Sequence, residues 1–297
     1  MNEIYEETRK HLVTSEADKP VKMVLKGQYK EAYEMLRDAD AAQCAPVIMG
    51  PVGCGKTLLA RYYAKQSGRP FRLLSLASSM RPEHLLGSFD PYAVTEWGYC
   101  PKAFKPGPLI EMMEKGGIFI ADWLNYAPEY LQNKFIEPIV KRSINIPYVG
   151  EIKASDGFFF IAIVTSGNIA ETYGLSEALK NCLNPWIKLD YPPRDLEIEI
   201  IKENTPQKID EDILEKIRDI LEVARNNPMM RPPSIRAGIS MAKTFAVKNK
   251  RGHVQDKYKE LREISKGVLW GHVKITTRKN YQDILNAILD KALGRKA

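Results

Sequence analysis

The stretch with the clearest chemical potential is an eight-residue run, residues 50–57, that satisfies the pattern G-x-x-x-x-G-K-[ST]. Its glycines let backbone N–H groups converge on phosphate oxygens, and the helix that follows directs the positive end of its dipole at the anion. Lys56 would reach the β- and γ-phosphates, and the Thr57 hydroxyl would bind Mg²⁺. The alternative is a glycine-rich turn that matches by chance. We therefore predict a Mg²⁺- and ATP-binding loop formed by Gly50, Pro51, Val52, Gly53, Cys54, Gly55, Lys56, Thr57 and Leu58.

Two further polar residues follow apolar runs that read as buried strands. Asp122 ends the run 118–122, and a carboxylate at the carboxyl end of such a strand lies where open α/β sheets bind ligands. We expect Asp122 to hold Mg²⁺ opposite Thr57, although it could instead cap the helix that begins near Pro128. Asn168 follows the strand 158–164, and its neutral amide would face the γ-phosphate or the attacking water.

The elements that must position these residues alternate between strands and helices. An apolar run, 46–49, precedes the loop and a helix-like run, 58–64, follows it; further strands are expected at 71–76, 118–122, 158–164 and 187–190. This order predicts an α/β fold, a parallel sheet flanked by helices. After Tyr191-Pro192-Pro193 only helical patterns remain, near 195–204, 212–226, 234–249, 257–270 and 281–293. We therefore expect a helical lead-in over 1–45, a nucleotide-binding domain over 46–191 and a helical lid domain over 192–297.

Residues 88–107 are expected to form an irregular, aromatic loop. Such a long loop within a compact domain is usually functional, but its rings could equally pack against their own domain. Both interpretations stay open. Two helices are expected beside this segment, one over 82–87 and one over 107–117 that ends at glycines. A helix from 128 to about 141 and a hairpin over 144–152 are expected to follow.

Charge and composition limit the possible classes of protein. The 297 residues carry a formal charge of +7. Residues 231–297 hold 16 Lys and Arg against 5 Asp and Glu, so this part alone is at +11 and the remainder at −4. Such an excess predicts a contact with nucleic acid or with an acidic face of a neighbouring subunit, or simply a solvated surface. The four scattered cysteines form no C-x-x-C pair, which argues against a zinc site or a disulfide framework. No apolar stretch is long enough to span a bilayer, and residues 1–7 lack the features of a signal peptide, so we expect a soluble, cytoplasmic protein with no membrane partner.

Taken in order, these motifs resemble the AAA+ superfamily over roughly residues 40–245. Within it they are most similar to the MoxR-type group, which includes the gas-vesicle, nitric-oxide-reductase and Rubisco-activating ATPases. The resemblance rests on five runs: Leu85-Leu86-Gly87-Ser88, Gly107-Pro108-Leu109, Leu124-Asn125-Tyr126-Ala127-Pro128-Glu129, Thr165-Ser166-Gly167-Asn168 and Ser234-Ile235-Arg236-Ala237. It implies that Asn168 is sensor 1, and that Arg236 is sensor 2, an arginine on the lid that contacts the γ-phosphate. Lys56, Asp122, Asn168 and Arg236 are then the expected catalytic set.

The chain departs from that family at two positions. Trp123 follows Asp122 where the family has a glutamate that orients the attacking water, and Cys182 stands where the family has its arginine finger. The resemblance implies a subunit that binds Mg-ATP, acts in a ring of identical or related subunits, expected to be a hexamer, and remodels or assembles a protein partner, as a chaperone does. We expect weak hydrolysis by this chain alone. A nucleic-acid motor that uses residues 231–297 and a scaffold that binds ATP without hydrolysing it are the alternatives.

Overall fold

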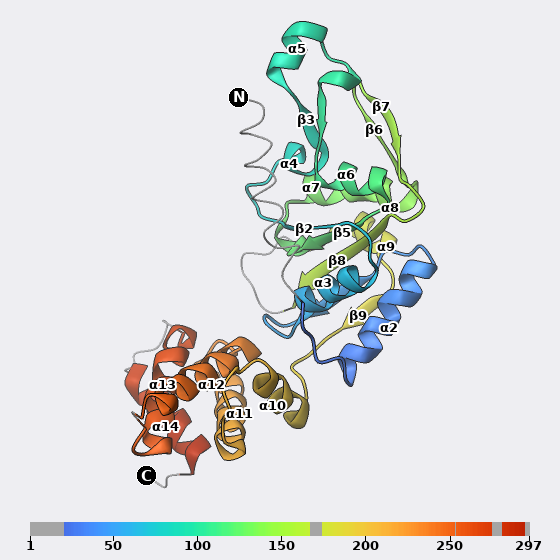
Figure 1. Cartoon of the computed structure of the whole chain (residues 1–297). Coiled ribbons are helices and arrows are strands. Elements are labelled where there is room, and N and C mark those ends of the chain that lie inside the picture. The colour runs from blue at the N-terminus through green and yellow to red at the C-terminus, as the bar shows by residue number, and fades with distance from the viewer. Residues whose placement is uncertain (1–20, 167–173, 253, 275–280, 295–297) are drawn as a thin grey trace.

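The computed structural model describes residues 21–166, 174–252, 254–274 and 281–294. Its centre is a five-stranded sheet in the order β2-β5-β8-β1-β9, in which every neighbouring pair is parallel. This finding confirms the expected α/β fold class (Figure 1). The strands are β1 (Val47–Gly50), β2 (Phe71–Ser75), β5 (Ile118–Asp122), β8 (Phe159–Thr165) and β9 (Trp186–Lys188).

The two central strands are buried on both faces because alternate side chains serve two separate cores. In β5, Ile118 and Ile120 pack on one face, and Phe119 and Ala121 on the other. The first face is covered by α2 (Gln28–Ala41) and α3 (Lys56–Gln66). The second face is covered by four short helices: α6 (Pro108–Lys115), α7 (Glu129–Gln132), α8 (Ile136–Val140) and α9 (Glu177–Cys182).

The expected single helix over 128–141 is divided. A 3₁₀ turn, Asn133–Phe135, separates α7 from α8. Pro138 has no N–H to donate to the carbonyl four residues before it, and the Gln132 side chain donates to the Ala127 and Gly174 carbonyls. Both features favour a tighter turn between the two short helices.

Two hairpins project from the part of the molecule that contains the sheet, at the end farthest from the C-terminal helices (Figure 1). The first pairs β3 (Gly87–Phe89) with β4 (Phe104–Pro106). The short helix α5 (Pro91–Trp97) connects these two strands, and α4 (Pro82–Leu86) precedes β3. The second hairpin pairs β6 (Ser143–Ile146) with β7 (Gly150–Lys153). The expectation of an irregular loop over 88–107 is therefore wrong. The Asp90 carboxylate caps α5 by accepting from Tyr92 and Ala93 N–H groups.

Ring contacts join the two hairpins. Phe89 lies 5.1 Å from Tyr99 and 5.3 Å from Phe104, and the Tyr148 ring of the second hairpin lies 5.4 Å from that of Tyr99. Packing of the rings against their own domain, one of the two interpretations of this segment, is thus observed. Tyr92 is nevertheless 88% exposed, so the partner interpretation stays open for the tip.

Among the described residues the C-terminal part consists of helices, turns and one isolated β-bridge between Met230 and Val273, and its helices match the expected ones to within about two residues. They are α10 (Arg194–Glu203), α11 (Glu211–Arg225), α12 (Ile235–Lys250), α13 (Lys257–Leu269) and α14 (Tyr281–Leu293). They share one apolar core of their own. The proposed boundary near residue 191 stays a prediction. None of the described helices is long and apolar enough to cross a bilayer.

Candidate functional site

The glycine-rich loop joins β1 directly to α3, as the motif requires. Gly53 and Gly55 have φ values of +74° and +103°, which side-chain-bearing residues rarely adopt. A Cβ on Gly53 would lie 2.2 Å from the Ser234 Cβ, so the loop touches the residue before α12. The three-turn helix α3 begins at Lys56 and therefore directs its unpaired N–H groups at the loop.

Lys56 is buried against the loop that precedes it. Its ammonium donates to the Gly50 carbonyl at 2.8 Å and to the Pro51 carbonyl at 2.7 Å. Burial lowers the pKa of this ammonium, and Arg236 lowers it further, whereas Cys54 and Asp122 oppose the change. A phosphate anion beside Lys56 would add counter-charge and offset the cost of burying the ammonium.

Two tyrosines hold other carbonyls of the loop. The Tyr29 hydroxyl of α2 donates to the Cys54 carbonyl at 2.8 Å, and the Tyr191 hydroxyl, beyond β9, donates to the Val52 carbonyl at 3.2 Å. Burial raises the pKa of both tyrosines, so both hydroxyls keep the proton that they donate. Carbonyls held from outside leave the loop N–H groups free to face a ligand.

Thr57 and Asp122 meet beside the loop. The Thr57 hydroxyl donates to the Asp122 carboxylate at 2.8 Å, and the Trp123 N–H donates to the other carboxylate oxygen at 2.9 Å. Burial raises the pKa of Asp122, while these hydrogen bonds and the charges of Lys56 and Arg236 oppose the rise. Asp122 is not the cap of the helix near Pro128, so that alternative is wrong.

This pair fits Mg²⁺, which prefers oxygen ligands and takes few of them from protein when phosphates supply the rest. A hydroxyl and a buried carboxylate stand side by side, and a cation would offset the cost of burying the carboxylate charge. Over the described ranges no group of three or more His, Cys, Asp and Glu side chains could hold a metal without such help.

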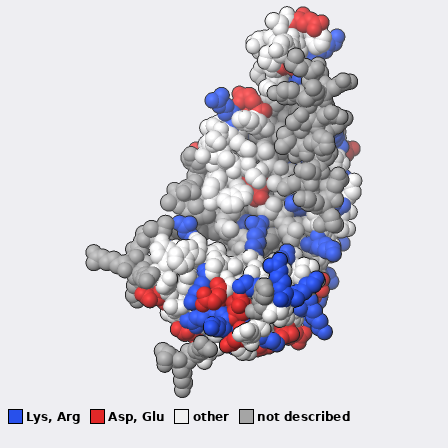
Figure 2. Space-filling model, turned by 60° about the vertical axis from the view of Figure 1, so that its left-hand side comes forward, with Lys and Arg blue, Asp and Glu red and all other residues white. Residues whose placement is uncertain are grey.

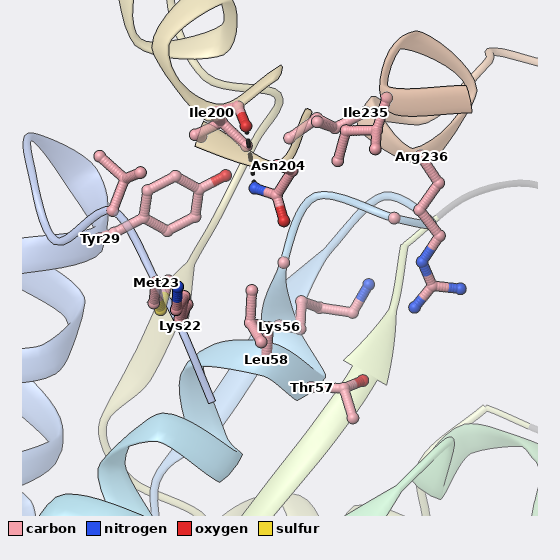
Figure 3. A pocket seen from close by; sticks show the side chains of 14 residues that line it. Lys22, Met23, Tyr29, Lys56, Thr57, Leu58, Ile200, Asn204, Ile235 and Arg236 are labelled. Carbon is pink, nitrogen blue, oxygen red and sulfur yellow. Dashed lines mark hydrogen bonds between the residues drawn. The ribbon is translucent and has the colours of Figure 1, made fainter. Parts of the chain in front are cut away.

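Arg236 comes to the same place from the other part of the chain. It is the second residue of α12 and lines one pocket of about 270 Å³ with Gly53, Lys56 and Thr57. The guanidinium, the ammonium and the Thr57 hydroxyl face the same space (Figure 3). Three of the four expected catalytic residues are therefore brought together; the fourth, Asn168, lies outside the described residues.

The rest of the pocket is largely apolar, and apart from the expected Leu58 its wall was not predicted as part of the site. This wall comes from the segment before α2 and from α2, α10 and α12, through Lys22, Met23, Val24, Tyr29, Ile200, Asn204, Ile235 and Ile239. Such a wall suits the flat face of a base, with the charged end left for phosphates. No local pattern marks residues 22–24, because they join the site only through tertiary contacts.

The two departures from the family pattern have the following surroundings. Trp123 has φ +60°, rare for a bulky residue, and its ring packs edge-on against Tyr126 at 4.7 Å. Cys182 ends α9, with its thiol 3.2 Å from the Ala178 carbonyl. Two cations that could replace the arginine are paired within the chain, Lys180 with Glu177 at 2.5 Å and Arg194 with Asp219 at 2.6 Å. Of the two glutamates that could replace the missing carboxylate, Glu137 pairs with Lys141 at 2.9 Å and Glu129 is exposed on α7.

Comparison with known proteins agrees with this geometry. Residues 46–183 match the model of the AAA domain, dynein-related subfamily. An uncharacterised protein of Staphylococcus saprophyticus is 33% identical over 175 residues, covering 58% of this chain and 64% of that protein. Protein NorQ of Paracoccus denitrificans is 27% identical over 170 residues, covering 55% of this chain and 59% of NorQ. Both alignments thus span less than two thirds of the relative.

Among solved structures, RuvB of Thermotoga maritima superposes with a TM-score of 0.55 at 17% identity, covering 81% of this chain and 70% of that one. At this identity the likeness concerns the fold alone. The match of residues 46–183 to an AAA domain and the likeness in fold agree with each other.

Proposed function

We propose that this chain is a Mg-ATP-binding AAA+ subunit of MoxR type that acts in a ring to remodel or assemble a protein partner. The observation that carries the proposal is that Lys56, Thr57 and Arg236, from α3 and α12, line one pocket, and that Asp122 at the end of β5 accepts a hydrogen bond from Thr57 beside it. Lys56 and Arg236 supply positive charge for the β- and γ-phosphates, and Thr57 and Asp122 supply oxygens for Mg²⁺. The similarity to NorQ supports the MoxR-type assignment.

The binding step is tested by calorimetric titration of Mg-ATP. Lys56→Ala removes the buried ammonium from the phosphate loop, so the affinity should fall at least about tenfold, the equivalent of one charge-assisted hydrogen bond. Lys65→Ala, on the same helix but away from the pocket, is the matched control and should bind as the parent does. Equal affinity for Lys56→Ala and the parent would show that the site is assigned wrongly.

The hydrolysis step is proposed to be slow in this chain alone. Phosphoryl transfer depends on positioning and charge stabilisation, and a trans-acting arginine contributes roughly 10³–10⁵ in rate. Neither the Trp123 indole, which only donates a hydrogen bond, nor the Cys182 thiol supplies what the family residues supply. A related subunit with an intact finger would supply the missing arginine, so we propose a mixed ring as the natural assembly.

The matching experiment compares ATP turnover of the parent with that of the double variant Trp123→Glu, Cys182→Arg. We expect little turnover in the parent and a gain in the double variant, measured at concentrations where mass measurement shows an ATP-dependent assembly. Fast turnover in the parent, with no gain in the variant, would remove the idea of an incomplete site. An assembly that forms with ATP but gains no turnover would favour the scaffold alternative.

A further inference from the structure

The glycine-rich phosphate loop, residues 50–57, touches the start of α12 directly. The Gly53 backbone lies against the Ser234 side chain, since a Cβ on Gly53 would lie 2.2 Å from the Ser234 Cβ. Its neighbour Val52 is held by the Tyr191 hydroxyl at 3.2 Å. Two residues beyond Ser234 stands Arg236, whose guanidinium faces the pocket (Figure 3). Any side chain that fixes both Tyr191 and the start of α12 would therefore set where Arg236 stands relative to the loop.

Arg225, the last residue of α11, touches both. Its Nε donates to the Pro233 carbonyl at 2.9 Å, immediately before Ser234. The face of its guanidinium lies over the Tyr191 ring, with the guanidinium carbon 3.9 Å from the ring centroid. One planar group thus holds the chain that enters α12 and the tyrosine that holds the phosphate loop.

The guanidinium is itself fixed by a buried carboxylate. Glu197 of α10 is fully buried and accepts from Arg225 Nη1 at 2.9 Å and Nη2 at 2.5 Å, a two-pronged contact. Arg218 Nε lies 2.7 Å from the same carboxylate but has no contact with Pro233 or Tyr191 among the described hydrogen bonds and ring contacts. The Arg225 side chain is only 10% exposed, so water does not compete for these contacts.

We propose that Arg225 is a positioning residue that couples the phosphate loop to Arg236, so that the γ-phosphate is recognised by a preset arrangement of loop and lid. The inference rests on the proposed function, because it needs a nucleotide in the pocket. A lysine at this position would keep the charge near Glu197. It could not, however, donate to Pro233, pair twice with Glu197 and cover the Tyr191 ring at once, since it lacks the planar fork.

The test is the ratio of the affinities for Mg-ATP and Mg-ADP, measured by calorimetry on the full chain. Arg236→Ala should lower this ratio, because only ATP offers a γ-phosphate to Arg236. Arg225→Lys should lower it too, by at least about fivefold, the lower end of typical coupling between sites. The combined variant should show no further fall, because both changes remove the same interaction.

Two more variants distinguish this coupling from a purely structural role of Arg225. Tyr191→Phe keeps the ring under the guanidinium and removes only the hydroxyl on Val52, so it should lower the ratio without affecting folding, even if Arg225→Lys folds poorly. Arg218→Lys alters a cation on the same carboxylate and is the matched control; it should leave the ratio unchanged. A purely structural role for Arg225 would lower the melting temperature and weaken both nucleotides equally.

The outcomes separate the two proposals. Absence of nucleotide binding by the parent overturns the proposed function, and the inference with it. Suppose that the parent binds ATP and that Arg236→Ala loses the preference for ATP over ADP. If Arg225→Lys and Tyr191→Phe then both keep the affinity ratio of the parent, the inference alone is overturned. Additive losses in the combined variant also overturn it, since independent effects would mean that Arg225 does not act through Arg236.

Discussion

At the scale of single residues, Gly53 leaves no room for a side chain. Its φ of +74° is strained for other residues by roughly 1–2 kcal/mol, and a methyl group there would overlap Ser234. We expect Gly53→Ala to weaken Mg-ATP binding and to lower the melting temperature, because the loop must move away from α12.

The control for this substitution is Gly68→Ala, after α3. Its φ of +68° imposes the same backbone strain, but nothing lies within 4 Å of the added methyl group. Nucleotide titration and thermal melting of both variants therefore isolate the contact with Ser234. If the two variants melted and bound alike, the contact between loop and α12 would have no energetic weight.

The residues of the site divide according to how local their signal is. Lys56, Thr57 and Asp122 could be predicted because a motif or a strand end marks each of them, and the contact of Thr57 with Asp122 follows because β1 and β5, separated by β8, end at the same edge of one parallel sheet. Tyr191 and Arg225 could not, because their roles arise from side chains that meet across long sequence separations. Arg236 needed the family resemblance, since by itself it is one surface arginine among many.

At the scale of elements, Glu111 joins α6 to β2. Its carboxylate pairs with Lys115 at 2.7 Å and with Arg72 through two contacts of 3.1 and 3.2 Å. Partial burial raises the pKa of this carboxyl, but Lys115 and Arg72 outweigh burial and leave the pKa below its usual value. A depressed pKa means that the ionised form stabilises the fold above the unfolded-state pKa, and that this stability is lost as the pH falls through the folded-state pKa.

We therefore expect Glu111→Gln to lower the free energy of unfolding at pH 7 by about 1 kcal/mol, the upper range for a partly exposed ion pair. The difference from the parent should shrink as the pH falls below about 4, where the parent carboxyl also becomes neutral. Urea unfolding of the parent and of Glu111→Gln, at pH 7 and below about pH 4, measures this difference. The control is Glu137→Gln, which breaks an exposed pair with Lys141 four residues on and should cost less than about 0.5 kcal/mol. An effect of Glu111→Gln that did not change with pH would contradict the electrostatic explanation.

Element prediction succeeded where the apolar period was long and failed where short elements depend on their contacts. The C-terminal helices and the buried strands have clear periods of 3.6 residues or continuous apolar runs. The segment 88–107 has neither, since α5 buries none of its residues and its hairpin is fixed by rings from two separate segments. Asp90-Pro91, a cap followed by a helix-starting proline, was the one local signal that could have placed α5.

At the scale of the whole molecule, the basic excess of residues 231–297 is partly neutralised within the helical part. Lys248, Lys257, Arg262 and Lys266 each pair with an acidic side chain, from Glu260, Asp210, Asp290 and Glu263 respectively. On the face shown in Figure 2, Lys and Arg gather over the lower part and are interspersed with Asp and Glu. This pattern favours contact with an acidic protein face over a continuous phosphate-binding track.

We therefore expect self-assembly in the presence of Mg-ATP to weaken as the salt concentration rises from about 50 to about 200 mM, while affinity for a labelled single strand stays low throughout. Light scattering and fluorescence anisotropy measure the two quantities. Charge reversal at exposed positions of α12 and its end, Lys243→Glu with Lys250→Glu, should reduce the salt dependence of assembly. A steep fall of strand affinity with salt, from a high starting value, would instead support the nucleic-acid motor.

The tryptophan after Asp122 also gives the pocket a built-in optical signal. The Trp123 backbone N–H donates to the Asp122 carboxylate and its ring packs edge-on against Tyr126, so a cation drawn to Asp122 changes the field around the ring. The other three tryptophans lie on α5, on β9 and after α13, and no hydrogen bond of the described residues joins them to Asp122. Their emission forms a constant background, and the arrival of nucleotide can be timed without any attached dye.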